Sequence, residues 1–139
     1  MSVSKNVKLK ISSVIENLLP SGLCDGEPER TAAEALGVLE GRGGIQRISY
    51  SETGEGGEVS SEITVSSDSV RVVRRGALVS DILFRENFSH KSLYTVPPYA
   101  FDMEVFTLKI RRSEGGIEIF YKMTLGGRDK RVKMTLEWQ

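Results

Sequence analysis

Apolar residues recur at every second position through most of this chain, and the spacing typical of helices is nearly absent. Successive side chains of a strand point to opposite faces, so a period of two predicts strands with one apolar and one polar face. The pattern is clearest over residues 117–125 and 132–138. Apolar positions of the other predicted strands are Val3, Val7, Leu9, Ile11 and Ile15; Ile48 and Tyr50; Val59, Ile63 and Val65; Val70 and Val72; Leu78, Ile82 and Phe84; and Phe88, Tyr94 and Val96.

Short runs of turn-forming residues separate the predicted strands, at 54–57, 66–69, 75–77, 85–87, 114–116 and 126–129. Their close spacing favours antiparallel hairpins joined in chain order. About eight or more strands in this arrangement usually close into a barrel, which leaves no exposed sheet edge. The predicted fold class is therefore all-β, a single antiparallel up-and-down barrel.

Two segments depart from the simple pattern. Over 99–111 the apolar face changes partway along the strand, and a bulge near Val105 and Phe106 would account for the change. Within 18–44, loop signals flank the alanine-rich run 31–36, which by propensity alone predicts one short helix with Thr31 as its N-cap.

The composition is that of one ordinary domain covering residues 1–139, with 39% hydrophobic and 27% charged residues. No apolar run approaches the roughly 20 residues that cross a bilayer, and the first residues do not resemble a secretory signal. The single cysteine, Cys24, cannot form an internal disulfide and has no histidine or basic neighbour in sequence to activate it. We therefore expect a cytoplasmic protein.

Nineteen basic and nineteen acidic residues cancel, so we expect neither nucleic acid nor a membrane as a partner. The charge is unevenly distributed, because residues 1–70 hold 6 basic and 11 acidic groups and residues 71–139 hold 13 and 8. Two interpretations remain open: opposite sides of one barrel attract each other, or the second half forms a basic patch for an acidic partner.

Four stretches in order resemble a known family. They are Pro98–Met103 continuing to Val105, Thr107 and Ile110; Ile48–Glu52; Val72–Ala77; and Tyr121–Met123 followed by Val132–Leu136. Together they resemble the YwiB-like family, small bacterial proteins of unknown function. The resemblance covers the chain apart from the loop 17–28. Ala100 stands where the family usually has glycine.

The resemblance implies a calycin (lipocalin-like) β-barrel, and it implies a strand over 29–40 in place of the helix. We expect the strand, since tertiary pairing overrides weak propensity. The family offers no reaction, substrate or cofactor, so the resemblance leaves function open.

Strand parity gives a set of polar residues that point into the predicted barrel: Tyr50, Glu52, Arg74, His90, Tyr94 and Tyr99. An apolar interior with a few convergent polar groups is the usual build of a small-molecule site. Each residue also has a structural interpretation. Glu52 and Arg74 could form an ion pair, His90 could be an ordinary hydrogen-bonded strand residue, and the tyrosines could fill the core.

Three classes of function remain. We favour a non-enzymatic binding protein that takes a small amphipathic or anionic ligand, with Arg74 gripping its carboxylate or phosphate. The alternative is an interaction or scaffold protein with a filled barrel, acting through its surface or as a homodimer. An enzyme using Glu52 or His90 as a base is the least favoured, because the chain lacks the residues of a nucleophilic triad or a metal site. We expect no cofactor and no metal.

Overall fold

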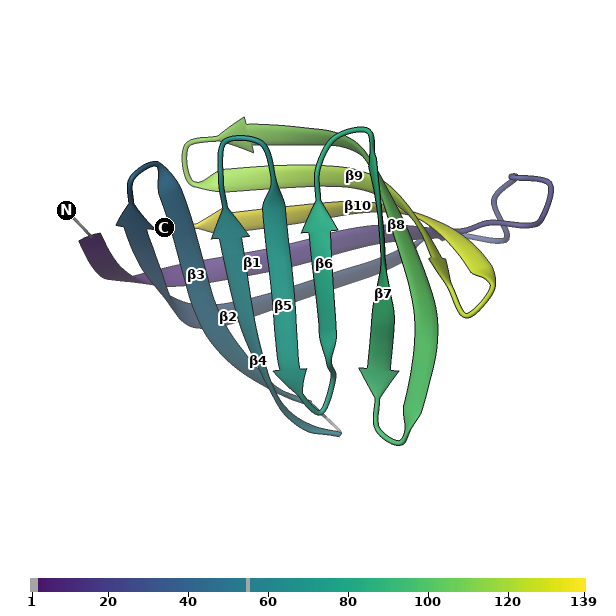
Figure 1. The fold of residues 1–139 in the computed structure, drawn as a ribbon, viewed down its shortest axis with the longest axis horizontal. Coiled ribbons are helices and arrows are strands. Elements are labelled where there is room, and N and C mark those ends of the chain that lie inside the picture. The colour runs from purple at the N-terminus through teal and green to yellow at the C-terminus, as the bar shows by residue number, and fades with distance from the viewer. Residues whose placement is uncertain (1–2, 55) are drawn as a thin grey trace.

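The computed structural model describes residues 3–54 and 56–139, which form ten β-strands (Figure 1). The strands are β1 (Val3–Asn17), β2 (Glu29–Arg42), β3 (Ile45–Gly54), β4 (Gly57–Val65), β5 (Val70–Gly76), β6 (Ser80–Phe84), β7 (Phe88–Val96), β8 (Tyr99–Ser113), β9 (Gly116–Leu125) and β10 (Arg128–Trp138). No helix interrupts them in the described part of the chain. The all-β prediction is confirmed.

The strands form one antiparallel sheet in the order β6-β5-β4-β3-β2-β1-β10-β9-β8-β7. Every neighbouring pair is consecutive in sequence except β1 and β10, so the sheet is the predicted up-and-down meander. In Figure 1, strands β3 to β7 stand upright, while β1, β2, β9 and β10 cross them in a second layer. The sheet curls round on itself into a nearly closed barrel.

The barrel closes at a seam between β6 and β7, the two ends of the sheet order. A single bridge joins Val79 to Thr95, with backbone hydrogen bonds of 2.8 and 2.9 Å. Farther along the seam, the Leu83 amide donates to Nδ1 of His90 at 3.1 Å. The seam is therefore held by one isolated bridge and a side-chain hydrogen bond, and not by a continuous ladder of backbone hydrogen bonds.

Residues 29–40 lie in β2, so the strand implied by the family resemblance is correct and the helix predicted by propensity is wrong. This segment pairs with β1 along its length, from Ile15 opposite Glu29 to Val3 opposite Gly41. The pairing gives a partner to the backbone groups of the alanine-rich run that face β1, which outweighs a small helix preference.

The bulge in β8 lies two residues beyond the predicted position. The register with β9 shifts between Thr107 and Lys109, and Thr107 is fully buried on the inner face. Because Thr107 is polar, apolar parity alone did not place it inside; its hydroxyl accepts a hydrogen bond from the Arg85 amide at 3.3 Å. In Figure 1, β8 rises beside β7 and then turns to run with β9, which matches the bend expected at a bulge.

One half of the barrel interior is packed solid. Its core residues are at most 1% exposed and come from seven strands: Leu9, Ile48, Ile63, Val70, Phe84, Ile119 and Leu136. We call this the filled half. The Phe84 ring packs against Tyr121, with 4.8 Å between ring centroids.

A candidate ligand cavity in the open half of the barrel

The other half of the interior holds a cavity of 510 Å³, which lies in the size range of small-molecule sites. All ten strands contribute to its wall, so the cavity is the barrel lumen itself. One lining residue from each strand in turn is Ile11, Thr31, Tyr50, Val59, Arg74, Ile82, Tyr94, Met103, Tyr121 and Val132.

The change from filled to open follows from residue size along the strands. On β1, Leu9 fills the core, but the same face continues through Ser13, which lies opposite Thr31 of β2. On β4, Ile63 fills the core and Ser61 follows it on the same face. Small inward side chains leave space that a packed core would otherwise occupy.

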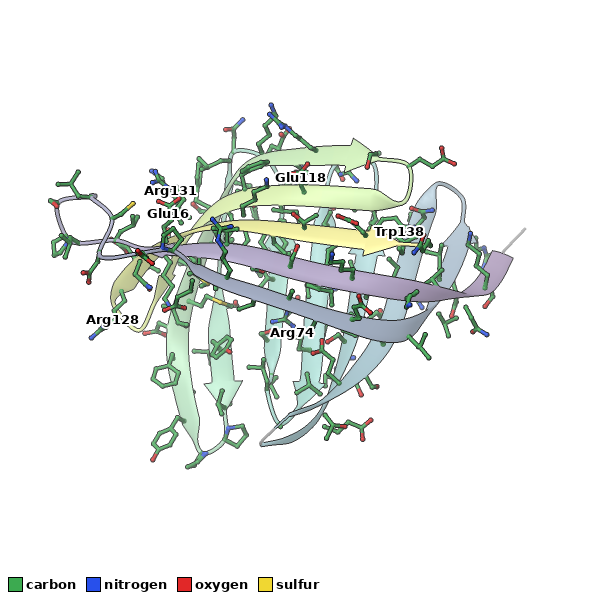
Figure 2. The ribbon with its side chains drawn as sticks, turned by 180° about the vertical axis from the view of Figure 1, so that it is seen from behind. Glu16, Arg74, Glu118, Arg128, Arg131 and Trp138 are labelled. Atoms are coloured by element: carbon green, nitrogen blue, oxygen red, sulfur yellow. The ribbon has the colours of Figure 1, made fainter. Side chains whose placement is uncertain are left out.

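Arg74 is the central charged group of the cavity wall. Cross-strand pairing places it beside Ser61 of β4 and Ser80 of β6, and Ser61 lies beside Tyr50 of β3. Figure 2 shows the Arg74 side chain between the two layers of the barrel, behind β1 and β2. Among the described residues Arg74 makes no ion pair. A half-buried guanidinium therefore faces a largely apolar space with its donors uncommitted.

Glu52 does not neutralise Arg74. Both line the cavity, yet no ion pair or hydrogen bond joins them in the described part of the chain, so the structural ion pair is not formed. Glu52 is exposed, whereas Lys130 lines the cavity and is half-buried. Among the described residues, two cations and one carboxylate thus line the cavity, which favours an anionic ligand.

Tyr121 is buried in the same wall, and burial raises its pKa to about 12, against a smaller lowering by the nearby Arg74 charge. The side chain is 8% exposed and its ring is fixed by Phe84. At neutral pH its phenol is protonated and serves as a hydrogen-bond donor or acceptor toward the cavity.

This pKa predicts an alkaline loss of stability. Below pH 10 the phenol holds its proton in both states, but between pH 10 and about 12 only the folded state holds it. The folded state then binds more protons, so the free energy of unfolding falls as pH rises, by roughly 2 to 3 kcal/mol in total. Denaturant titrations of the wild type and Tyr121→Phe from pH 8 to 12 measure the difference. Parallel curves for the two proteins would contradict the assignment.

The structure brings together four of the six residues predicted from parity, because Tyr50, Glu52, Arg74 and Tyr94 all line the cavity. His90 does not line the cavity. It lies at the seam, where its Nδ1 accepts a hydrogen bond from the Leu83 amide. Tyr99 was predicted to point into the barrel, and this is wrong: it is 66% exposed. Tyr99 is the first residue of β8, which extends past the rim of the barrel. A side chain on the inward face of the strand has no strand opposite it there and is left exposed.

The predicted set of inward polar residues did not include Lys130, Tyr121 and Ser13, which line the cavity. Lys130 lies two positions before Val132 and four before Met134, so the same period of two could have placed it inside. The sequence reasoning instead placed Lys130 in the turn before the strand that begins at Val132, whereas the structure has it in β10. Within the described residues, no group of three or more histidine, cysteine or carboxylate side chains could hold a metal ion.

Comparison with known proteins places this barrel in a family. A family model described as "Domain of unknown function (DUF1934)" matches residues 24–136, most of the chain. This chain belongs to the DUF1934 family. No curated protein matches it. The DUF1934 match spans β2 to most of β10 but not β1, so it leaves out the cavity residues Ile11 and Ser13.

A solved structure supports the fold over nearly the whole DUF1934 chain. The crystal structure of the ywiB protein from Bacillus subtilis superimposes with a TM-score of 0.79 at 24% identity, covering 98% of this chain and 93% of that one. At this identity the likeness shows the barrel fold alone, and it includes the β1 strand. The family resemblance is confirmed.

The described residues include no helix with the length and apolar content that a membrane span requires.

Proposed function

We propose that this protein is a non-enzymatic binding protein that takes a small amphipathic anion into the open half of its barrel. The observation that carries the proposal is the uncommitted Arg74 guanidinium on the wall of a 510 Å³ cavity. A charged group in low dielectric is costly without a partner, and a ligand carboxylate or phosphate supplies one with paired hydrogen bonds.

The apolar part of the ligand has a matching surface. Ile11, Ile15, Met103 and Met123 line the same cavity, and methionine adapts its shape to varied apolar groups. Tyr50 and Tyr94 also line the cavity, and their hydroxyls would orient the ligand. An apolar wall with few polar groups sets the orientation of the ligand without any reacting group.

Binding without catalysis is favoured by how the two candidate bases are used. His90 commits Nδ1 to a backbone amide at the seam, and Glu52 is exposed at the cavity. A general base has to reach the substrate proton inside the site; His90 lies outside the cavity, and Glu52 lines it but is exposed to solvent. We also propose a cytoplasmic location, because a single cysteine cannot form an internal disulfide and therefore suits a reducing compartment.

Replacing Arg74 with methionine should weaken binding of dansyl-labelled undecanoic acid at least about tenfold, because the carboxylate loses its charge-assisted hydrogen bonds. Fluorescence titration of the dansyl group measures the affinity, and circular dichroism checks that the variant folds. Arg75→Gln, the next residue on β5 and exposed, is the matched control and should bind like the wild type. The corresponding undecanamide should bind equally to wild type and Arg74→Met.

The proposal fails if the wild type does not bind the acid, or if Arg74→Met binds it as tightly. A variant that does not fold would show that Arg74 is structural, and Arg74→Lys then tests the charge alone, because it keeps a cation at this position. Lysine lacks the planar fork of arginine, so partial binding by Arg74→Lys supports direct contact with the anion.

A homodimer is the second candidate, favoured by an apolar face on the β7–β8 hairpin. Val96 pairs with Tyr99, and Phe101 follows on the same face; they are 40%, 66% and 42% exposed. The double variant Tyr99→Ser/Phe101→Ser should then elute as a monomer in size-exclusion chromatography with light scattering, while the wild type elutes as a dimer. A wild-type monomer at all tested concentrations would exclude this candidate.

A further inference from the structure

A second hollow, separate from the cavity, lies at the end of the barrel that belongs to the filled half. Three turns meet there: β2–β3 with Gly43 and Gly44, β4–β5 with Ser66 and Ser67, and β8–β9 (Figure 1). The end of β10 adds Trp138, whose place at this end of the strand is shown in Figure 2. The hollow has a volume of 580 Å³, enough for a small molecule.

The charge of this hollow has one sign. Arg42 and Arg112 line it, and none of its described lining residues is acidic. Neither arginine forms an ion pair with any described residue. The acidic residues of the same turns are directed elsewhere: Asp68 pairs with Arg85 at 3.7 Å, and Glu114 lines a neighbouring hollow with Lys8 and Lys10. Two uncommitted guanidiniums at one site attract an anion.

The hollow is also lined by apolar side chains, among them Trp138 and Ile45. Trp138 packs against the core and is half-buried, and Ile45, which lines the same hollow, is 48% exposed. A Cβ added to Gly43 or Gly44 would meet nothing within 4 Å, so this turn leaves the approach open. A half-buried indole and an exposed isoleucine in one hollow offer apolar surface on which a planar group can stack.

We propose that this hollow binds a small molecule that joins a planar aromatic group to a phosphate or carboxylate. The ring packs on Trp138 and Ile45, and Arg42 and Arg112 hold the anion. The site lies at the opposite end of the barrel from Arg74 and shares none of the described lining residues of the cavity. Its ligand therefore binds whether or not the cavity is occupied.

Trp138 is the only tryptophan of the chain, so its fluorescence reports on this end of the barrel alone. Phenyl phosphate is the probe, because it carries a ring and a phosphate and little else. Titration should change the emission in a saturable way with a dissociation constant at or below roughly 1 mM. Inorganic phosphate should bind at least about tenfold more weakly, because it lacks the ring.

The variant Arg42→Gln/Arg112→Gln should lose at least about tenfold in affinity for phenyl phosphate. Arg111→Gln is the matched control, since Arg111 is the neighbour of Arg112 but lies over the Phe120 ring, 5.5 Å from its centroid. Arg74→Met should bind phenyl phosphate like the wild type. If the double variant does not fold, each single substitution should lose part of the affinity.

Any one of four results overturns the proposal. They are an absence of saturable change in the wild type, equal affinity in the double variant, loss of binding in Arg74→Met, and equal affinity for inorganic phosphate and phenyl phosphate. Loss in Arg74→Met would place the probe in the cavity and would leave the proposed function standing.

Discussion

Replacing Gly76 with alanine should lower the free energy of unfolding by at least about 3 kcal/mol, a large part of the stability of a domain this size. Gly76 ends β5 with φ at +115°, a conformation that side-chain-bearing residues rarely adopt. A Cβ there would lie 2.2 Å from the backbone oxygen of Glu58, which also accepts a hydrogen bond from Ala77. Backbone cannot move aside cheaply, so β5 would separate from β4 at this point.

Urea denaturation measures this loss, and Gly41→Ala is the control. Gly41 lies in β2 without a positive φ, and an added Cβ would meet nothing within 4 Å. Alanine there should leave stability within about 1 kcal/mol of the wild type or raise it slightly. Equal unfolding midpoints for the two variants would contradict the close approach of β4 and β5.

Phe84→Ala should cost about 3 to 5 kcal/mol, the usual range for a buried phenylalanine. Phe84 is 1% exposed, ends β6 next to the seam, and packs against Tyr121. Its removal leaves a hole in the filled half and loosens the edge where the barrel closes. The same denaturation assay applied to Phe88→Ala, whose side chain is 37% exposed, should show a loss below about 1 kcal/mol. Similar losses for both variants would mean that the filled half is not tightly packed.

The fold was largely predictable because its information is local. Alternation identified strand segments such as 117–125 and 132–138, and turn residues separated them, so the meander and its closure followed. The run 31–36 could not be assigned by propensity, because the pairing with β1 that makes it a strand comes from residues about twenty positions away. The family resemblance supplied that information.

The site was predictable only in part, because parity gives the face of a strand and not the height along the barrel. Tyr50 and Arg74 were placed correctly, since their strands run through the middle of the wall. Tyr99 lies on the inward face of a strand that extends past the rim. His90 depends on the seam, and no local pattern shows where a sheet closes on itself. Lys130 was missed because it was assigned to the turn before the last strand, and that strand in fact begins at Arg128.

The central claim is that the open half of the barrel takes an amphipathic anion while the filled half does not. The most direct test is a titration with dodecanoate followed through isoleucine methyl resonances by NMR. Ile11 and Ile15 line the cavity, whereas Ile48, Ile63 and Ile119 are at most 1% exposed in the filled half. We expect saturable shifts at the first two and little change at the other three. Unchanged Ile11 and Ile15 resonances, or shifts confined to Ile45 at the opposite end, would contradict the account.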